Sequence, residues 1–136
     1  MTLSPRSGIQ ARASTLGGTV VERERVLFVD DEEHVLKAFE RTLARCGFDS
    51  DCVADGAAAK EALATHDYAV IATDYRLATE DGLSLINELS GMQPDATGIL
   101  VTGVCDLDLV LEVVNDHPVS HVVCKPWNFD ELNSIL

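Results

Sequence analysis

Five short apolar runs alternate with amphipathic stretches between residues 26 and 136, and this alternation restricts the fold more than any other property of the chain. Runs of this length, bounded by polar or turn residues, predict buried β-strands. The expected strands cover residues 26–29, 48–53, 68–74, 98–103 and 121–125.

The stretches between these runs carry helical patterns. In the first, Val35, Leu36, Phe39 and Leu43 fall on one face, and Gly47 has the position of a glycine that ends a helix. Asp106 and Asn128 are candidate N-caps for the last two helices. The expected helices cover residues 33–46, 56–65, 82–90, 107–114 and 129–136, the last of them barely two turns long.

Strands that alternate with helices predict a parallel sheet with helices on both faces. The run at residues 48–53 is polar at alternate positions, which is typical of an edge strand. Right-handed crossovers leave few arrangements of such a sheet. We therefore expect an α/β fold with a doubly wound five-stranded sheet.

Residues 1–24 are rich in Ser, Thr, Gly and Arg and have no periodicity, which predicts a flexible N-terminal tail. Residues 1–25 carry a net charge of +2, from four Arg and two Glu, and residues 26–136 carry −15, from six Lys or Arg and 21 acids. An acidic body repels phosphates, so direct nucleic acid binding by residues 25–136 is not expected.

The chain contains neither a membrane-span pattern nor a secretory-signal pattern. No apolar run approaches the roughly 18 residues that a membrane helix needs. The N-terminal segment has no apolar core that would make it a signal peptide. We expect a cytoplasmic protein that is not bound to a membrane.

The four cysteines, at positions 46, 52, 105 and 124, form no CxxC pair and have no histidine at zinc-ligand spacing. In a cytoplasmic protein such cysteines are expected to be reduced thiols with a structural role.

Polar side chains lie at the carboxyl ends of four of the apolar runs. Asp30 and Asp31 end the first, Asp74 the third, Thr102 the fourth and Lys125 the fifth. In a parallel sheet these ends meet at one edge, where ligands collect. Three carboxylates in one place repel one another, and oxygen ligands of this kind suit Mg²⁺.

This set of residues resembles the receiver domain of two-component response regulators. The resemblance covers about residues 25–136 and includes the order of the five residues, their spacing (43, 28 and 23 positions from Asp31 to Asp74, Thr102 and Lys125 in turn) and the Lys125-Pro126 dipeptide. It implies a flavodoxin-like sheet with strand order 2-1-3-4-5. It also implies a cis Lys125-Pro126 bond.

The resemblance further implies a phosphorylation site. Asp74 would be the phosphoacceptor, supplied by a sensor histidine kinase or a phosphotransfer protein. Asp30, Asp31, Asp74 and the backbone carbonyl of Arg76 would bind Mg²⁺, while Thr102 and Lys125 would contact the phosphoryl group. Such a domain is a signalling switch that catalyses only its own phosphorylation and dephosphorylation.

The sequence departs from the family pattern at two places. After the acceptor, receivers commonly read D-x-x-M-P-x-x-D-G, whereas this chain reads DYRLATEDG, with Leu77 and Ala78 in place of Met and Pro. Arg76 could pair with Glu80 or Asp81, or lean over the site. The usual switch aromatic falls on Val122, so either the backbone near the fourth helix carries the signal, or His121 or Trp127 takes a share.

Three other functions are compatible with parts of this pattern. A pseudo-receiver that docks partners without phosphorylation is the main alternative, because Val122 replaces the aromatic residue. An FMN carrier is disfavoured by the four consecutive acids at residues 30–33, and an aspartate phosphatase by Arg76. The short last helix suggests a truncated domain and an output domain beyond residue 136. A homodimer is a further possible partner arrangement for such a domain.

Overall fold

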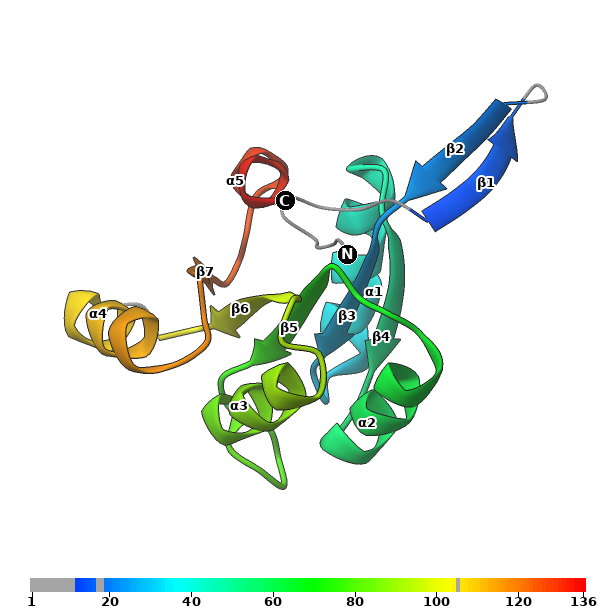
Figure 1. Cartoon of the computed structure of the whole chain (residues 1–136). Coiled ribbons are helices and arrows are strands. Elements are labelled where there is room, and N and C mark those ends of the chain that lie inside the picture. The colour runs from blue at the N-terminus through cyan, green and yellow to red at the C-terminus, as the bar shows by residue number, and fades with distance from the viewer. Residues whose placement is uncertain (1–11, 17–18, 105) are drawn as a thin grey trace.

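The computed structural model describes residues 12–16, 19–104 and 106–136, with side chains from residue 24 onward (Figure 1). Its central element is a five-stranded sheet with the strand order β4-β3-β5-β6-β7, in which all neighbours are parallel. The strands are β3 (Arg25–Val29), β4 (Asp49–Val53), β5 (Val70–Asp74), β6 (Thr97–Thr102) and β7 (His121–Cys124). Numbered within this sheet, the order is 2-1-3-4-5, which confirms the predicted topology and the edge position of β4.

Five helices connect and cover the strands. They are α1 (Glu33–Arg45), α2 (Gly56–Thr65), α3 (Gly82–Met92), α4 (Leu107–Asp116) and α5 (Phe129–Ile135). Their ends agree with the sequence to within two residues, α3 and α4 each continuing two residues beyond the predicted stretch.

Local chemistry sets several helix ends. The side chains of Asp106 and Asn128 accept hydrogen bonds from Leu109 N and Glu131 N, which confirms the two predicted N-caps. Gly47 has φ +88°, a left-handed conformation that an L side chain rarely adopts, so a glycine there ends α1 without strain.

The helices lie on both faces of the sheet (Figure 1). One face packs against α1 and α5, and its core includes Phe28, Phe39 and Leu132. The other face packs against α2, α3 and α4 in two further clusters. This arrangement confirms the doubly wound α/β fold.

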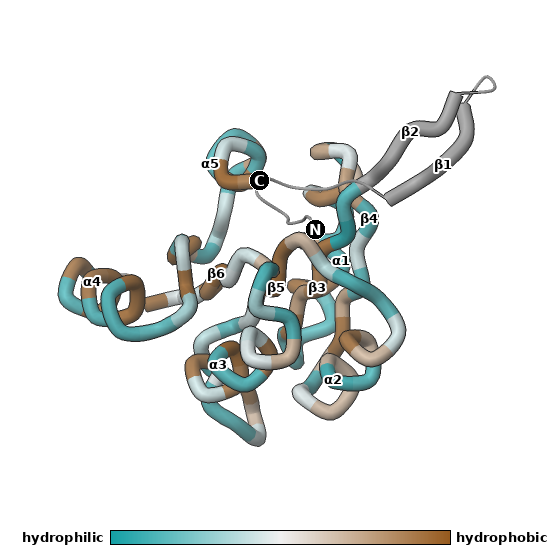
Figure 2. The backbone as a smooth tube through the Cα atoms, in the orientation of Figure 1, coloured by the Kyte–Doolittle hydropathy of each residue, from teal (hydrophilic) through white to brown (hydrophobic). Residues whose placement is uncertain are grey.

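β3 contributes apolar side chains to both faces of the sheet. Val26 and Phe28 join the α1 side, Leu27 and Val29 join the α2 side, and all four side chains are fully buried. Figure 2 shows the same result as hydrophobic segments in β3 and β5 at the centre of the molecule. A strand covered on both faces therefore needs a continuous apolar run.

α4 is the least buried of the longer helices. Val113 is its one fully buried residue, whereas α3 buries five. Leu107, Leu111 and Val114 are 70%, 50% and 40% exposed. α4 is thus held to the sheet by little apolar area.

The N-terminal segment contains more regular structure than the sequence predicted. β1 (Arg12–Leu16) and β2 (Thr19–Arg23) form a two-stranded antiparallel sheet that projects from the rest of the molecule (Figure 1). The rest of the predicted tail, residues 1–11 and 17–18, lies outside the described residues.

The cysteines differ in state. Cys46 and Cys52 are free, as predicted. Cys124 is disulfide-bonded, so the prediction of a reduced thiol is wrong at this position. Spacing and compartment indicate only an average redox state and do not encode which sulfur atoms approach one another. Cys105 lies outside the described residues.

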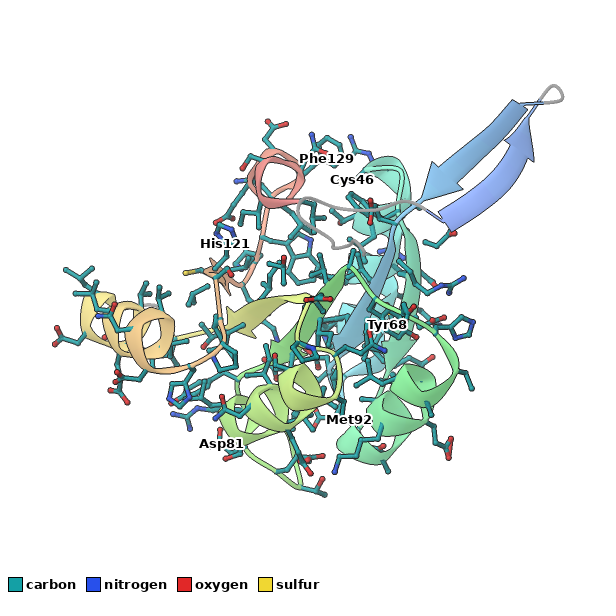
Figure 3. All side chains as sticks on the ribbon, viewed as in Figure 1. Cys46, Tyr68, Asp81, Met92, His121 and Phe129 are labelled. Atoms are coloured by element: carbon teal, nitrogen blue, oxygen red, sulfur yellow. The ribbon has the colours of Figure 1, made fainter. Side chains whose placement is uncertain are left out.

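The end of α1 lies against the start of α5. Figure 3 labels Cys46, after α1, and Phe129, at the start of α5, near each other. The Arg45 guanidinium lies 4.0 Å from the centroid of the Phe129 ring, a cation–π distance. Although α5 is only seven residues long, this contact attaches it to α1, and buried Leu132 packs into the core beneath it.

None of the helices in the described ranges combines the length and the apolar character that a membrane span requires.

Candidate functional site

The carboxyl ends of the parallel strands bring the predicted site residues to one edge of the sheet. Asp74 is paired with Val101 in register, and Thr102 with Cys124. The pattern continues just past the strands, where Asp30 N donates to Val53 O at 3.1 Å and Lys125 N donates to Thr102 O at 2.8 Å. Strand register, rather than any local turn, therefore positions these side chains.

Three carboxylates form a cluster at this edge. Asp30, Asp31 and Asp74 each place one oxygen so that all three atoms lie within 4.8 Å of one another. Asp30 is fully buried, Asp74 is 6% exposed, and Asp31 is exposed. The cluster is thus buried at Asp30 and Asp74 and open to solvent at Asp31.

Lys125 supplies the positive charge of the cluster. Its Nζ lies 2.9 Å from Asp30 Oδ2 and 3.0 Å from Asp74 Oδ1. Burial alone would lower the pKa of the Lys125 ammonium, but the hydrogen bonds to both carboxylates outweigh it, so the pKa is raised above the ordinary value. Lys125 therefore keeps its positive charge between the two carboxylates.

The same surroundings also raise the pKa of the Asp74 carboxyl, although the individual causes act differently. Burial raises the pKa of the Asp74 carboxyl, the hydrogen bond from Lys125 lowers it, and the charge of Asp30 raises it again, with a net upward shift. One ammonium thus compensates three carboxylates only in part.

The donor set fits a hard divalent cation. Three carboxylates and one ammonium leave a net charge of −2 at this edge when all four groups are ionised. Mg²⁺ binds carboxylate oxygens and keeps several waters, so it suits carboxylates that have an open side. The residues present therefore match a magnesium site.

Two backbone amides hold the acids in place. Glu32 N donates to Asp30 Oδ1 at 2.9 Å, and Ala78 N donates to Asp31 Oδ2 at 2.6 Å. Sequence reasoning missed Ala78, because a backbone contact leaves no side-chain pattern. The sequence contains one indication of this contact: position 78 is not the usual proline, and proline has no backbone N–H to donate.

Thr102 lies at the same edge and is 1% exposed. Its hydroxyl oxygen accepts a hydrogen bond from Val104 N at 2.9 Å and donates to Val104 O at 3.2 Å. The hydroxyl is thus connected to the loop that leads to α4.

Arg76 does not adopt the first of the two arrangements considered for it, a charge pair with Glu80 or Asp81. Within the described residues its guanidinium forms no ion pair with Glu80 or Asp81; it lies 5.7 Å from the centroid of the Tyr75 ring. Glu80 instead accepts a hydrogen bond from Gly56 N at 2.9 Å. The role of the Arg76 carbonyl in metal binding stays a prediction.

The candidate switch positions lie on the β7 side. Val122 is half-buried and packs against the cluster that contains Ile86, Leu100 and Val113, while His121 is exposed. Trp127 packs edge-on against Phe39 at 5.0 Å and donates from Nε1 to Thr42 Oγ1 at 3.1 Å. Trp127 is therefore part of the α1 core, and Lys125-Pro126 is cis, as predicted.

A cavity of about 480 Å³ adjoins the cluster on the α1 side. Its lining combines Lys125 with mainly apolar surface from α1 and the segment after β7: His34, Val35, Ala38, Pro126 and Trp127. The ammonium thus borders both the acidic cluster and an apolar hollow.

Comparison with known proteins places this site in a family. The family described as "Response regulator receiver domain" matches residues 26–136. The chain is 34% identical over 110 residues to the C4-dicarboxylate transport transcriptional regulatory protein DctD of Rhizobium meliloti (strain 1021), covering 79% of this chain and 23% of DctD. It is 29% identical over 112 residues to the regulatory protein AtoC of Escherichia coli (strain K12), covering 82% and 24%. The chain thus spans about a quarter of the length of these relatives.

Solved structures give the same result. The signal receiver domain of an HD domain-containing protein from Pseudomonas fluorescens Pf-5 is similar with a TM-score of 0.73 and 27% identity, over 82% of this chain and 89% of that one. A response regulator protein from Burkholderia pseudomallei, solved with a phosphorylated aspartic acid, a calcium ion and citrate, is similar with a TM-score of 0.72 and 27% identity, over 80% and 64%. With this fold and this edge of the sheet, the chain belongs to the response regulator receiver domain family.

Proposed function

We propose that this domain accepts a phosphoryl group on Asp74 and thereby switches an output. The observation that carries the proposal is the contact of the Lys125 ammonium with both Asp30 and Asp74 at the carboxyl edge of the sheet. The similar Burkholderia pseudomallei protein, which contains a phosphorylated aspartic acid, supports the same chemistry.

The transfer step is a displacement at phosphorus. A carboxylate oxygen of Asp74 attacks the phosphorus of the donor, the bond from phosphorus to the donor atom breaks, and the electron pair stays on the donor. The product is an acyl phosphate. Water later attacks the same phosphorus, the bond to Asp74 breaks, and inorganic phosphate leaves the regenerated carboxylate.

The residues at the edge reduce the repulsion between a carboxylate and an anionic donor. Lys125 donates hydrogen bonds to the acceptor carboxylate and lies close enough to meet the incoming phosphoryl oxygens. Asp30, Asp31, Asp74 and the Arg76 carbonyl would hold Mg²⁺, which, when bound, supplies positive charge to the phosphoryl oxygens. Thr102 would donate its hydroxyl to one of these oxygens after leaving Val104.

The natural donor in this proposal is a phosphohistidine on a sensor kinase or phosphotransfer protein. Such a protein must bring its histidine to Asp74, and the apolar cavity beside Lys125 offers contact area next to the reacting group. The output would be a further domain or a separate partner, as the words "transcriptional regulatory protein" in the relative's name suggest.

The proposal is tested with acetyl phosphate and Mg²⁺. We expect intact-mass analysis to detect one added phosphoryl group, and hydroxylamine to convert Asp74 to its hydroxamate. Asp74→Asn should remain unmodified, and the matched control Asp67→Asn, at an exposed position before β5, should react normally. A pseudo-receiver would stay unmodified in every form and would contradict the proposal.

A further inference from the structure

We infer that the backbone N–H of Ala78 is a positioning group that fixes Asp31 as a metal ligand, and that this role depends on position 78 not being proline. The inference rests on the proposed function, because the metal site is the one used for phosphorylation. It concerns a contact that no side-chain motif reports.

Asp31 needs an external support more than its neighbours do. Asp30 accepts hydrogen bonds from Lys125 and Glu32 N, and Asp74 accepts one from Lys125. Within the described part of the chain, Ala78 N is the one hydrogen-bond donor to the Asp31 side chain. The exposed carboxylate would otherwise sample several rotamers in water.

The bond from Ala78 has the features of a strong contact. The donor and acceptor atoms lie 2.6 Å apart, the acceptor is an ionised carboxylate, and the residues are 47 positions apart in the chain. The contact therefore joins the end of β3 to the loop that follows the acceptor Asp74.

The loop that carries Ala78 is itself fixed at both ends. Gly82 N donates to Tyr75 O at 3.0 Å, and Arg76 and Asp81 form an antiparallel bridge. Glu80 accepts from Gly56 N at 2.9 Å, which attaches the loop to the start of α2. The Ala78 amide is thus held in place before any ligand binds.

The residue type at position 78 decides whether the contact exists. Every residue except proline offers a backbone N–H. Chains that carry the common family pattern have proline at this place and cannot make the same bond, whereas this chain has Ala78. The contact is therefore a property of this sequence rather than of the fold.

The geometry leaves Asp31 able to bind a cation while it is held. The amide occupies Oδ2, and a carboxylate has a second oxygen and further lone pairs. Hydrogen bonds of this type orient metal ligands, and their loss commonly lowers metal affinity about 10–100-fold. We expect the lower end of this range, because Asp30 and Asp74 remain in place.

The test compares Ala78→Pro with Ala78→Gly and Ala78→Ser, which both keep the N–H. Mg²⁺ binding is measured by calorimetry without a phosphodonor. We expect the Kd to rise about tenfold in Ala78→Pro and to change less than about twofold in the other two variants. An unchanged Kd in Ala78→Pro, or an equal loss in all three variants, would overturn the inference.

A second measurement separates a lost hydrogen bond from a distorted loop. In the NMR spectrum of the wild type without Mg²⁺, the Ala78 amide proton should lie downfield, and Asp31→Ala should shift it upfield. The amide signals of Gly56 and Gly82 should stay in place in Ala78→Pro if the loop keeps its path. An Ala78 amide that does not respond to Asp31→Ala would refute the contact.

The outcomes distinguish this inference from the proposed function. Normal phosphorylation of Asp74 with equal Mg²⁺ affinity in wild type and Ala78→Pro would reject only the positioning role. A tenfold affinity difference without any modification of Asp74 would reject only the phosphorylation. A wild type that binds no Mg²⁺ would reject both.

Discussion

Lys125 and Asp30 are 95 positions apart in the sequence, yet Nζ of the lysine lies 2.9 Å from Oδ2 of the aspartate. The Asp30 side chain is fully buried, and that of Lys125 is 20% exposed. A buried carboxylate that loses its cation is costly, because the protein interior solvates a single charge poorly. The pair therefore connects the stability of the domain to its site.

Lys125→Met should destabilise the domain in the absence of divalent cations. Methionine keeps most of the aliphatic stem and removes the ammonium, which leaves Asp30 and Asp74 without compensation. We expect the free energy of unfolding to fall by about 2–3 kcal/mol in urea titrations with EDTA. Lys60→Met, which removes the exposed Lys60–Glu88 pair at 2.8 Å, is the control and should have little effect. Equal effects of the two changes would contradict the assignment.

Asp74→Asn should stabilise the domain in the absence of metal and should reduce the stabilisation that Mg²⁺ provides. Without divalent cations, the change removes one of three mutually repelling carboxylates, and we expect the free energy of unfolding to rise by about 1 kcal/mol. With Mg²⁺ at about 100 times its Kd, the wild type should gain about 2.7 kcal/mol, and the variant distinctly less. Thermal unfolding with and without EDTA measures both. A variant that gains as much from Mg²⁺ as the wild type would exclude Asp74 as a ligand.

Gly82→Ala should displace the backbone of the acceptor Asp74 and of Tyr75. A Cβ at Gly82 would collide with the carbonyl oxygen of Asp74 and lie 2.9 Å from that of Tyr75. Because both obstacles are backbone atoms, the loop must shift, and we expect a loss of about 2–3 kcal/mol in chemical unfolding. Gly91→Ala, in the same helix, meets nothing within 4 Å and should be neutral or stabilising by up to about 1 kcal/mol. Similar losses at both positions would show that helix propensity alone explains the result.

Cys52 should react with iodoacetamide unusually slowly at moderately alkaline pH. Burial raises the pKa of the Cys52 thiol from 9.0 to about 11, and the thiolate is the reactive form. Peptide mapping should find alkylation still accelerating between pH 9 and 11 in the folded protein, but levelling off in urea. Because the folded state keeps a proton that the unfolded chain loses in this window, the free energy of unfolding should fall there as pH rises. Cys52→Ala should remove that part of the fall.

Sequence reasoning recovered the sheet and the site for a common physical reason. Runs such as residues 26–29 and 99–101 are apolar because both sheet faces are covered, and the polar residue that follows each run, Asp30 or Thr102, marks its carboxyl end. The sequence alone therefore predicts that Asp30, Asp74 and Lys125 lie together.

The features that sequence reasoning missed depend on contacts that side-chain patterns do not encode. The pairing of β1 with β2 joins segments that have no clear alternation of apolar and polar residues. The disulfide of Cys124 depends on the approach of two sulfur atoms in space. The bond from Ala78 to Asp31 depends on the path of a loop.

The small buried area of α4 has a consequence for the motions of the domain. A helix that contributes one fully buried side chain can detach locally at a much lower free energy than α3, which contributes three, those of Leu85, Ile86 and Leu89. Its amides should exchange with deuterium well before those of α3. Thr102 is hydrogen-bonded to Val104, just ahead of α4. A displacement of Thr102 at the sheet edge should therefore move α4 more easily than it moves the more deeply buried helices.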